Sequence, residues 1–265
     1  MYVVKVGGKV VDKNLGNVVE SVSRFARTSP LVFIHGGGNV VTEFCRRVGV
    51  EPKFVTSPEG IRSRYTDKDE LEVYVMVMAG KLNKEIVSSL VSKGVKCVGI
   101  SGADGPTLIA ERKKRIVIVD ERGRKRVIDG GFTGKVVEVR VDLLKTLLSL
   151  GYTVVIAPIA IDSEGTMLNV DADQVAFKVA SALKADKLVI LTDVPGVIID
   201  GTVVKEVKVG EVEGIVSKVG AGMNRKLIEA SNAVVSGVGE VIISSGLVED
   251  PLTNALSGNG TVVRG

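Results

Sequence analysis

The sequence predicts an α/β protein built on a mainly parallel β-sheet with helices on both faces. Short apolar runs alternate with longer helical segments along the chain, which is the pattern of repeated strand–helix units. Hydrophobic residues make up 45% of the chain and aromatic residues only 4%, a composition typical of strands that are buried on both faces. With 265 residues, the chain can bury one large core or two closely joined lobes.

The first half of the chain contributes strands and helices in alternation. An apolar run begins almost at the N-terminus, and a second one leads to the only histidine of the chain. A polar stretch that contains Pro52 and Pro58 separates these two strand–helix units from a long helical segment. We expect strands at 3–6, 31–34 and 96–100, and helices at 17–27, 40–48 and 67–92.

The second half begins with a charged hairpin, whose strands are expected at 115–120 and 125–129. We then expect helices at 141–150, 172–183 and 223–235, strands at 153–158, 187–191 and 240–244, and a final edge strand at 261–264. No linker rich in Pro or Ser divides the chain, so a single domain over 1–265 is predicted. It would comprise an N-terminal lobe at about 1–161 and a C-terminal lobe at about 162–265.

Four junctions between these elements have the composition of phosphate-handling loops. They are Lys5-Val6-Gly7-Gly8, His35-Gly36-Gly37-Gly38, Asn169-Val170-Asp171-Ala172-Asp173 and Gly222-Met223-Asn224-Arg225-Lys226. Glycine lets the backbone approach an anion closely, and a helix N-terminus adds a favourable dipole. One glycine pair is weak support, because tight turns use such pairs routinely. Ligands of parallel sheets bind at the carboxyl ends of the strands, so we expect these junctions to meet in one cleft.

Three charged residues in these junctions have both an ordinary and a functional interpretation. Lys5 lies in an apolar strand, where an unpaired ammonium is costly, and it must reach either solvent or an anion. Lys226 is expected in the first turn of a helix, where a plain surface lysine is the alternative. Asp173 either supports a helix N-terminus, as Asp171 does, or holds two lysines in position.

Arg62, Arg64 and His35 are further candidates. The two arginines precede the long helix and can bind carboxylates bidentately, although exposed loop arginines are equally common. A single histidine excludes a metal cage made of several, and we expect a structural role for it rather than that of a general base. We expect no metal site formed by protein ligands.

The net charge of +4 is unevenly distributed. Residues 111–126 hold eight basic and three acidic residues, a local charge of +5. This hairpin is either a solvated surface or a docking arm for an acidic partner. Nucleic acid is disfavoured because no aromatic residues are interleaved with the bases and no known binding motif is present.

Cysteine content and hydropathy suggest the cytoplasm. Cys45 and Cys97 are too few for a disulfide framework, and we expect both to be structural thiols in a reducing compartment. No apolar run is long enough for a membrane helix, and the chain starts directly in a strand, so we expect neither membrane association nor a signal peptide.

The order and spacing of the four junctions resemble the amino acid kinase family, and within it the acetylglutamate kinase branch. A fifth shared motif is Leu191-Thr192-Asp193-Val194-Pro195-Gly196-Val197, and the resemblance covers nearly the whole chain. It implies a three-layer α/β/α sandwich that transfers the γ-phosphoryl group of ATP, with Mg²⁺ held through the ATP phosphates. The acceptor would be a carboxylate, which needs no general base.

The resemblance also implies roles for individual residues. Lys5 and Lys226 would stabilise the transferred phosphoryl group, and Asp173 would orient both lysines. The nucleotide would be held in the C-terminal lobe and at the first glycine loop, by Gly7, Gly8, Thr192, Asp193, Gly196 and Met223. The acceptor would be held in the N-terminal lobe, by Gly36, Gly37, Gly38, Arg62, Arg64 and Asn169.

One departure points to a particular branch. The acceptor motif of acetylglutamate kinases, Gly-Leu-Arg-x-Thr, is matched half by Gly60-Ile61-Arg62 and half by Arg64-Tyr65-Thr66. Arg64 is the better match, which leaves Arg62 spare. The form Ser63-Arg64-Tyr65-Thr66-Asp67 is similar to kinases of carrier-dependent lysine or arginine biosynthesis, which phosphorylate 2-aminoadipate or glutamate linked to a small acidic carrier protein.

Three hypotheses follow for the function. The first is such a carrier-dependent kinase, in which the basic hairpin would dock the carrier. The second is an N-acetylglutamate kinase with a free substrate. The third is a silent nucleotide-binding module, which the presence of Lys5, Lys226 and Asp173 disfavours. Family habit implies a homodimer.

Overall fold

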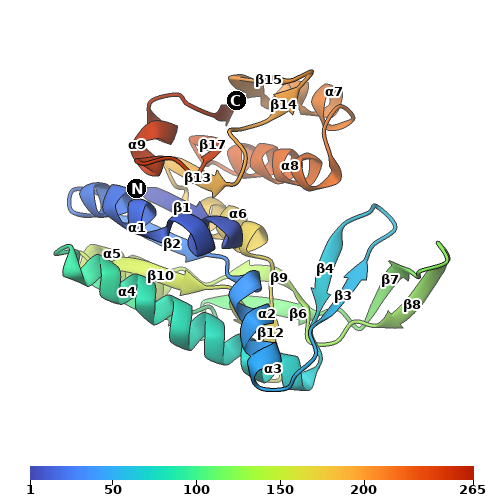
Figure 1. Ribbon diagram of the computed structural model, residues 1–265. Helices are drawn as coiled ribbons and strands as arrows, with labels where there is room; N and C mark the ends of the chain where they lie inside the picture. The colour runs from blue at the N-terminus through green and yellow to red at the C-terminus, as the bar shows by residue number, and fades with distance from the viewer.

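A computed structural model describes residues 1–265 and has an eight-stranded β-sheet at its centre (Figure 1). In sheet order the strands are β16 (Glu206–Lys208), β18 (Thr261–Arg264), β17 (Glu240–Ser245), β13 (Lys187–Thr192), β1 (Tyr2–Val6), β2 (Leu31–His35), β10 (Thr153–Ala157) and β5 (Cys97–Ser101). The strands from β17 to β5 run parallel to one another, whereas β18 is antiparallel to β17. The predicted mainly parallel sheet is therefore confirmed.

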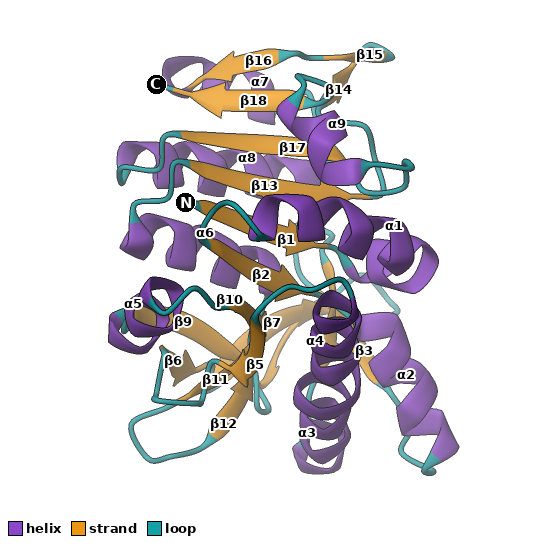
Figure 2. Cartoon of the chain, turned by 90° about the vertical axis from the view of Figure 1, so that its left-hand side faces the viewer, coloured by secondary structure: helices purple, strands orange, loops and turns teal.

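The inner strands are apolar on both faces because helices cover both faces. In β1, Val3 belongs to the core on one face, and Val4 and Val6 belong to the core on the other. Figure 2 shows the two helical layers in front of and behind the sheet. One layer contains α1 (Gly8–Ala26), α4 (Asn83–Ser92) and α9 (Pro251–Leu256), and the other contains α5 (Asp142–Ser149), α6 (Ala172–Leu183) and α8 (Ala221–Val235). This is the expected three-layer α/β/α sandwich.

The long helical segment expected at 67–92 is present and contains a π-helical stretch. α3 (Lys68–Val75), the π-helix η1 (Met76–Leu82) and α4 follow one another without a break. Such π insertions often occur at functional sites. Here η1 packs against the second glycine loop, since a Cβ added at Gly37 would lie 2.2 Å from Leu82 Cδ1 and 2.9 Å from Met78 Sδ.

Smaller elements extend the N-terminal part of the chain beyond the central sheet. A second sheet has the order β12 (Met167–Asn169), β11 (Ile159–Ile161), β6 (Leu108–Arg112) and β9 (Gly134–Val139). The predicted hairpin is present as β7 (Arg115–Val119) and β8 (Lys125–Asp129). It lies beside an unpredicted hairpin of β3 (Lys53–Thr56) and β4 (Arg62–Tyr65), and both project from the body of the molecule (Figure 1).

Other short elements were not predicted. They are β14 (Ile198–Ile199), β15 (Thr202–Val203), the 3₁₀-helix η2 (Val209–Glu211) and α7 (Val212–Val216). The helix expected at 40–48 is present as α2 (Gly38–Arg47). No helix of the chain combines the length and the apolar character needed to cross a membrane.

The start of one helix and the place of one strand in the sheet differ from the sequence prediction. α1 begins at Gly8, directly after β1, rather than near residue 17. Its first half is rich in polar residues and its backbone leaves the helical region at Asn14, so the apolar spacing is interrupted there. The strand at 261–264 is not the edge of the sheet, because β16 flanks it. Three residues are too few for β16 to show a strand period.

Candidate active site

The two glycine loops lie against each other at the carboxyl ends of β1 and β2. These strands are parallel neighbours, with Val6 opposite His35. A Cβ added at Gly36 would lie only 2.7 Å from the backbone nitrogen of Gly8, so this close approach requires glycine. α1 and α2 both begin here, and the N–H groups of their first turns have no partner within the helix. The two N-termini therefore form a site suited to an anion.

Asp173 joins two lysines at the same edge of the sheet. It lies in the first turn of α6, where its Oδ1 is 2.6 Å from Lys5 Nζ of β1 and its Oδ2 is 2.7 Å from Lys226 Nζ of α8. The side chains of Lys5 and Asp173 are only 8% and 18% exposed. The structure thus brings together three residues that are far apart in the sequence, in the grouping that the sequence analysis expected.

The group of Lys5, Asp173 and Lys226 carries one net positive charge. Burial alone would raise the pKa of the Asp173 carboxyl, but the charges of Lys5 and Lys226 and their hydrogen bonds outweigh burial and hold this pKa well below its usual range. Asp171 has the other role considered for this segment. It caps α6, because its Oδ1 accepts hydrogen bonds from the backbone N–H groups of Asp173 (2.8 Å) and Gln174 (3.0 Å).

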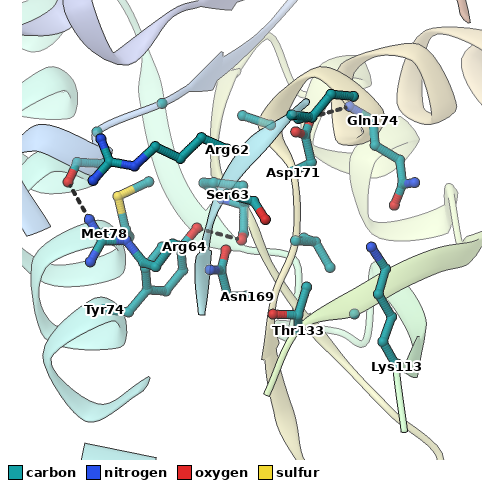
Figure 3. Close-up of a pocket in the computed structure, with 18 of the residues that line it drawn as sticks. Arg62, Ser63, Arg64, Tyr74, Met78, Lys113, Thr133, Asn169, Asp171 and Gln174 are labelled. Carbon is teal, nitrogen blue, oxygen red and sulfur yellow. Dashed lines mark hydrogen bonds between the residues drawn. The ribbon is translucent and has the colours of Figure 1, made fainter. Parts of the chain in front are cut away.

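A cavity of about 500 Å³ lies next to this group. Its wall includes the second glycine loop, β4, the long helix, the connection between β6 and β7, and the segment before α6, through Gly36, Gly37, Gly38, Arg62, Arg64, Tyr74, Met78, Lys113, Asn169 and Asp171. In Figure 3, Arg62 and Arg64 approach the cavity from one side and Lys113 and Gln174 from the other. A second, smaller cavity contains Asp173 and Lys226 and shares Ile61, Asp171, Gln174 and Arg225 with the first, so the two are adjacent.

The two arginines of β4 have different surroundings. Arg64 has a 9% exposed side chain, forms an ion pair with the fully buried Glu70, and donates through Nη2 to the carbonyl oxygen of Gly38 (2.8 Å) and to the hydroxyl of Thr42. Arg62 is exposed, and its guanidinium carbon lies 4.3 Å from the centroid of the Phe54 ring. It has no ion pair.

Asn169 is fixed beside the cavity by two hydrogen bonds. Its side-chain amide donates to the hydroxyl of the buried Thr66 at 2.8 Å, and its backbone N–H donates to the carbonyl of Phe132 at 2.9 Å. The side chain therefore has a fixed orientation at the end of β12, between the glycine loop and α6.

None of the six expected nucleotide residues lines either of the two cavities. Thr192 ends β13 next to the first glycine loop, since a Cβ added at Gly7 would be 4.0 Å from Thr192 Cα. Asp193 forms an ion pair with Lys9 of α1 at 2.7 Å, a partner that the sequence analysis missed. Met223, in the first turn of α8, packs on the hydrophobic core. Gly196 lies in a turn against Thr261 and lines neither of the two cavities.

His35 is a buried residue of β2. Its Nδ1 lies 3.1 Å from the carbonyl oxygen of Gly36, and its Nε2 has no hydrogen-bond partner. Burial lowers the pKa of His35 to about 4, so the ring is neutral at neutral pH. The ring lines neither cavity. A structural role, as expected, is the one that these surroundings support.

Several residues of the site carried no sequence signal strong enough to find them. Tyr74 and Met78 reach the cavity from the long helix, where they look like ordinary core positions. Glu70 looks like a helix-capping acid, although its side chain is fully buried against Arg64. Arg225, which pairs with Asp171 at 3.5 Å, could have been inferred from its position beside Lys226.

The model of the amino acid kinase family matches residues 1–245, and the chain belongs to this family. A LysW-aminoadipate/LysW-glutamate kinase of Metallosphaera sedula is 54% identical over 99% of this chain and 100% of its own length. The protein of the same name from Sulfolobus acidocaldarius is 51% identical, again over 99% of this chain and all of its own.

Solved structures of more distant proteins share the fold. The N-acetylglutamate synthase of Neisseria gonorrhoeae, in complex with coenzyme A and N-acetylglutamate, superposes with a TM-score of 0.82 at 23% identity, over 100% of this chain and 59% of that one. Carbamate kinase of Giardia lamblia bound to AMP-PNP superposes with a TM-score of 0.70 at 16% identity, over 99% and 98% of the two chains. At these identities the likeness concerns the fold alone.

Proposed function

We propose that the chain transfers the γ-phosphoryl group of ATP to the side-chain carboxylate of 2-aminoadipate or glutamate whose amino group is attached to a small acidic carrier protein. The product would be an acyl phosphate of lysine or arginine biosynthesis. The family membership and the names of the relatives support this proposal. The observation that carries it is the ion-paired group of Lys5, Asp173 and Lys226 beside two glycine-lined helix N-termini.

The chemistry proposed for this group is charge stabilisation without a general base. A carboxylate acceptor is already ionised at neutral pH, so positioning and electrostatics suffice for phosphoryl transfer. Lys5 and Lys226 would stabilise the negative charge on the transferred group from two sides. Asp173 would keep both ammonium groups in place, because its carboxyl stays ionised.

ATP would be bound between the first glycine loop and the C-terminal lobe. Gly8 would donate its backbone N–H group to the phosphates at the start of α1. The N–H of Gly7 already donates to the carbonyl oxygen of Leu191 at 2.9 Å, so Gly7 would contribute by letting the phosphates approach the backbone closely. Thr192, Asp193 and Met223 would contact the rest of the nucleotide, and Gly196 would shape the turn behind them. No group of three or more His, Cys, Asp or Glu side chains forms a metal site in the chain, and we propose that Mg²⁺ is held through the ATP phosphates.

The acceptor would occupy the larger cavity. Gly36, Gly37 and Gly38 would border its reacting carboxylate, and Asn169, held by Thr66, would bind the groups at its α-carbon. Arg62 and Arg64 line the same cavity, and Arg64 lies beside Gly38, to whose carbonyl oxygen it donates (Figure 3). The cavity also opens toward the β7–β8 hairpin through Lys113, which offers a route for the link between the acceptor and its carrier.

The β7–β8 hairpin has the surface that an acidic carrier would need. Three of the eight bases of 111–126 pair with Asp120 or Asp129, and the other five have no ion-pair partner. We name these five the basic hairpin surface: Lys113, Lys114, Arg115, Arg122 and Lys125. Beside them Val117 lies opposite Val127, and these residues are 45% and 62% exposed. Exposed apolar residues on a hairpin that also carries unpaired cations are suited to docking an acidic protein.

We further propose a cytoplasmic homodimer. The absence of a disulfide, with Cys45 buried and Cys97 half-buried, agrees with a reducing compartment. The homodimer rests on the habit of the family, and sedimentation of the purified chain would test it.

The test of the proposed function is ADP release with MgATP and four acceptors: free N-acetylglutamate, free N-acetyl-2-aminoadipate, and glutamate or 2-aminoadipate linked to the acidic carrier. We expect efficient turnover with the carrier-linked acceptors. Comparable or better turnover of free N-acetylglutamate would instead identify an N-acetylglutamate kinase. No ADP release with any acceptor would favour a silent nucleotide-binding module.

A further inference from the structure

Arg225 of α8 lies at the boundary between the two cavities. Four residues line both of them: Ile61, Asp171, Gln174 and Arg225. Arg225 is the only cation among these four. Its neighbour in the sequence, Lys226, lines the smaller cavity alone, where it pairs with Asp173. A group that moves from the lysine–aspartate group into the larger cavity therefore passes the boundary at which Arg225 lies.

The protein itself holds Arg225 only loosely. Its Nη2 lies 3.5 Å from Oδ2 of Asp171, and the two side chains are 43% and 45% exposed. An ion pair as exposed as this contributes little to stability, so a bound anion can replace Asp171 at small cost. Asp171 would keep its own position in the exchange, because its other oxygen, Oδ1, caps α6.

Three other cations of the site are bound more firmly. Lys5 and Lys226 lie 2.6 and 2.7 Å from the carboxylate oxygens of Asp173. Arg64 pairs with the fully buried Glu70, which has to keep its cation because an unpaired buried charge is costly. Arg225 can thus change its partner, whereas these three cannot do so without leaving a carboxylate unpaired.

A second cation shares the larger cavity with Arg225. Lys113 lines this cavity, and partial removal from water together with the charge of Arg225 lowers the pKa of its ammonium group, while the charge of Asp171 opposes them. Glu229, one turn after Arg225 on α8, lines only the smaller cavity and forms no ion pair with it. Near the boundary, Asp171 is therefore one carboxylate beside two cations, and a further negative charge would be favoured there.

We propose that Arg225 is a further catalytic residue, which exchanges Asp171 for the γ-phosphoryl group and neutralises the charge on that group as it passes from ATP to the acceptor. The inference deepens the proposed function and rests on it only in that the chain transfers this group to a carboxylate. A guanidinium suits the task, because it can donate to two phosphoryl oxygens at once.

The transfer step needs positive charge and no proton donor or acceptor. A carboxylate oxygen of the acceptor forms a bond to the γ-phosphorus, and the bond between this phosphorus and the β–γ bridging oxygen breaks. ADP leaves with that oxygen and the electron pair of the broken bond. Negative charge is then spread over the three peripheral oxygens of the group in flight, and cations around these oxygens lower the barrier.

The test compares four single variants with the wild-type chain: Arg225→Gln, Arg225→Lys, Asp171→Asn and the control Arg24→Gln. Asp171→Asn releases Arg225 and keeps a side-chain oxygen that can cap α6. Arg24 is the matched control, because it pairs with Asp250 at 2.6 Å and the two side chains are 47% and 39% exposed. Neither of these two residues lines either cavity.

The single-turnover rate, the KM for the acceptor and the melting temperature are measured for each variant, with every acceptor that the wild type uses. The affinity for MgADP is measured with the acceptor present, with and without aluminium fluoride, which mimics the phosphoryl group in transfer. The acceptors are carrier-linked glutamate and 2-aminoadipate and their free N-acetyl forms.

Arg225→Gln should lower the single-turnover rate about a hundredfold, the usual cost of removing one group that stabilises charge in the transition state. It should leave the affinity for MgADP and the KM for the acceptor within twofold of the wild type, and aluminium fluoride should no longer tighten MgADP binding. Arg225→Lys should recover part of both losses. Asp171→Asn should keep the rate within threefold of the wild type, and Arg24→Gln should change neither quantity.

Three results would overturn the inference. The first is a single-turnover rate in Arg225→Gln within threefold of the wild type. The second is an equal loss of rate in Asp171→Asn, with a lower melting temperature in both variants, which would make the ion pair a structural link between α6 and α8. The third is a change confined to the KM for carrier-linked acceptors, which would assign Arg225 to carrier docking.

The same measurements separate this inference from the proposed function. If the wild type uses only free N-acetyl acceptors, the carrier-dependent function is refuted, while the rate ratios with those acceptors still decide the role of Arg225. A wild type that transfers the phosphoryl group to none of the acceptors refutes both.

Discussion

At the scale of single residues, the carboxylate of the site stays ionised, whereas the buried histidine outside the two cavities stays neutral. Asp173 is kept charged by two lysines, whereas His35, a short distance away along the sheet edge, is kept neutral by burial among apolar strands. The difference arises because Asp173 has two cationic partners that favour its charged form, whereas burial and the nearby charge of Lys84 both disfavour the charged form of His35. Each residue gives a prediction that can be measured separately.

Asp173→Asn should lower kcat by at least a hundredfold while ATP still binds. The change removes the buried negative charge that holds Lys5 and Lys226 near each other, and displaced electrostatic groups typically cost about 10²–10³ in rate. Single-turnover rates and calorimetric ATP binding would measure the two effects. Asp142→Asn, in the exposed first turn of α5, is the matched control. Unchanged kcat in Asp173→Asn would contradict the mechanism.

His35 should make the fold lose stability as the pH falls below about 6.5. Its folded pKa of about 4 lies below the ordinary value of 6.5, so between these values the unfolded chain binds one more proton than the folded chain. The contribution is therefore complete above pH 6.5 and is lost as the pH falls toward 4, at about 1.4 kcal/mol per pH unit. His35 is the only histidine, but burial also raises the pKa of Glu70 toward this window, so a variant without the histidine is needed to isolate its contribution.

The measurement is the free energy of unfolding in denaturant at pH 5.0, 5.75 and 6.5, for the wild type and His35→Asn. The asparagine variant should be less stable at every pH. Its free energy of unfolding should lack the fall with decreasing pH that the uptake of one proton by His35 causes in the wild type. Equal slopes in the two proteins would show that His35 is not the titrating group.

At the scale of elements, the site depends on the close approach of two strand–helix junctions. Gly36 packs directly against the backbone of Gly8, so a Cβ at Gly36 would clash with it. A Cβ at Gly38, in contrast, would meet no atom within 4 Å. The π-helix η1 adds a third element to this contact, because Met78 and Leu82 fill the space beside Gly37. The glycines are therefore required for packing between backbones as much as for anion binding.

Gly36→Ala should destabilise the fold by about 1–3 kcal/mol, because overpacking forces the two loops apart. Gly38→Ala should leave the stability nearly unchanged, which makes it the matched control for the same chemical change two residues away. Thermal and denaturant unfolding of both variants would test this. A similar melting temperature for the two would contradict the described packing of the loops.

At the scale of the whole molecule, the catalytic body and the proposed docking surface are separate parts. β7 and β8 contribute no side chain to the two cores, and the backbones of Lys114 and Gly130 meet at the base of the hairpin, where the N–H of Gly130 donates at 3.2 Å. The hairpin can thus be shortened without opening the core, and its charges can be changed without touching the lysine–aspartate group.

Replacing residues 115–129 by a short glycine turn should leave the melting temperature within a few degrees of the wild type. It should raise the KM for the carrier-linked acceptor at least tenfold, and it should leave turnover of any free N-acetyl acceptor unchanged. Charge reversal at Lys114 and Lys125 should have a smaller effect of the same kind, which salt should diminish. An unchanged carrier KM in the shortened chain would refute the docking role.

The sequence by itself determined the alternation of strands and helices, the mainly parallel sheet, the long helix before residue 92 and the charged hairpin. These features depend on local composition and on the period of apolar residues, which the sequence displays directly. It also indicated Lys5, Asp173 and Lys226, because the lysine in an apolar strand and the motif order were visible without coordinates.

Only the tertiary structure decided which of the two arginines is free, where α1 begins and which short strands complete the sheets. Arg62 and Arg64 look alike in the sequence, and they differ because Glu70, Gly38 and Thr42 happen to surround one of them. Strands of two or three residues, such as β14–β16, are stabilised by their neighbours rather than by their own pattern. Such partners come from distant parts of the chain, and no local period records them.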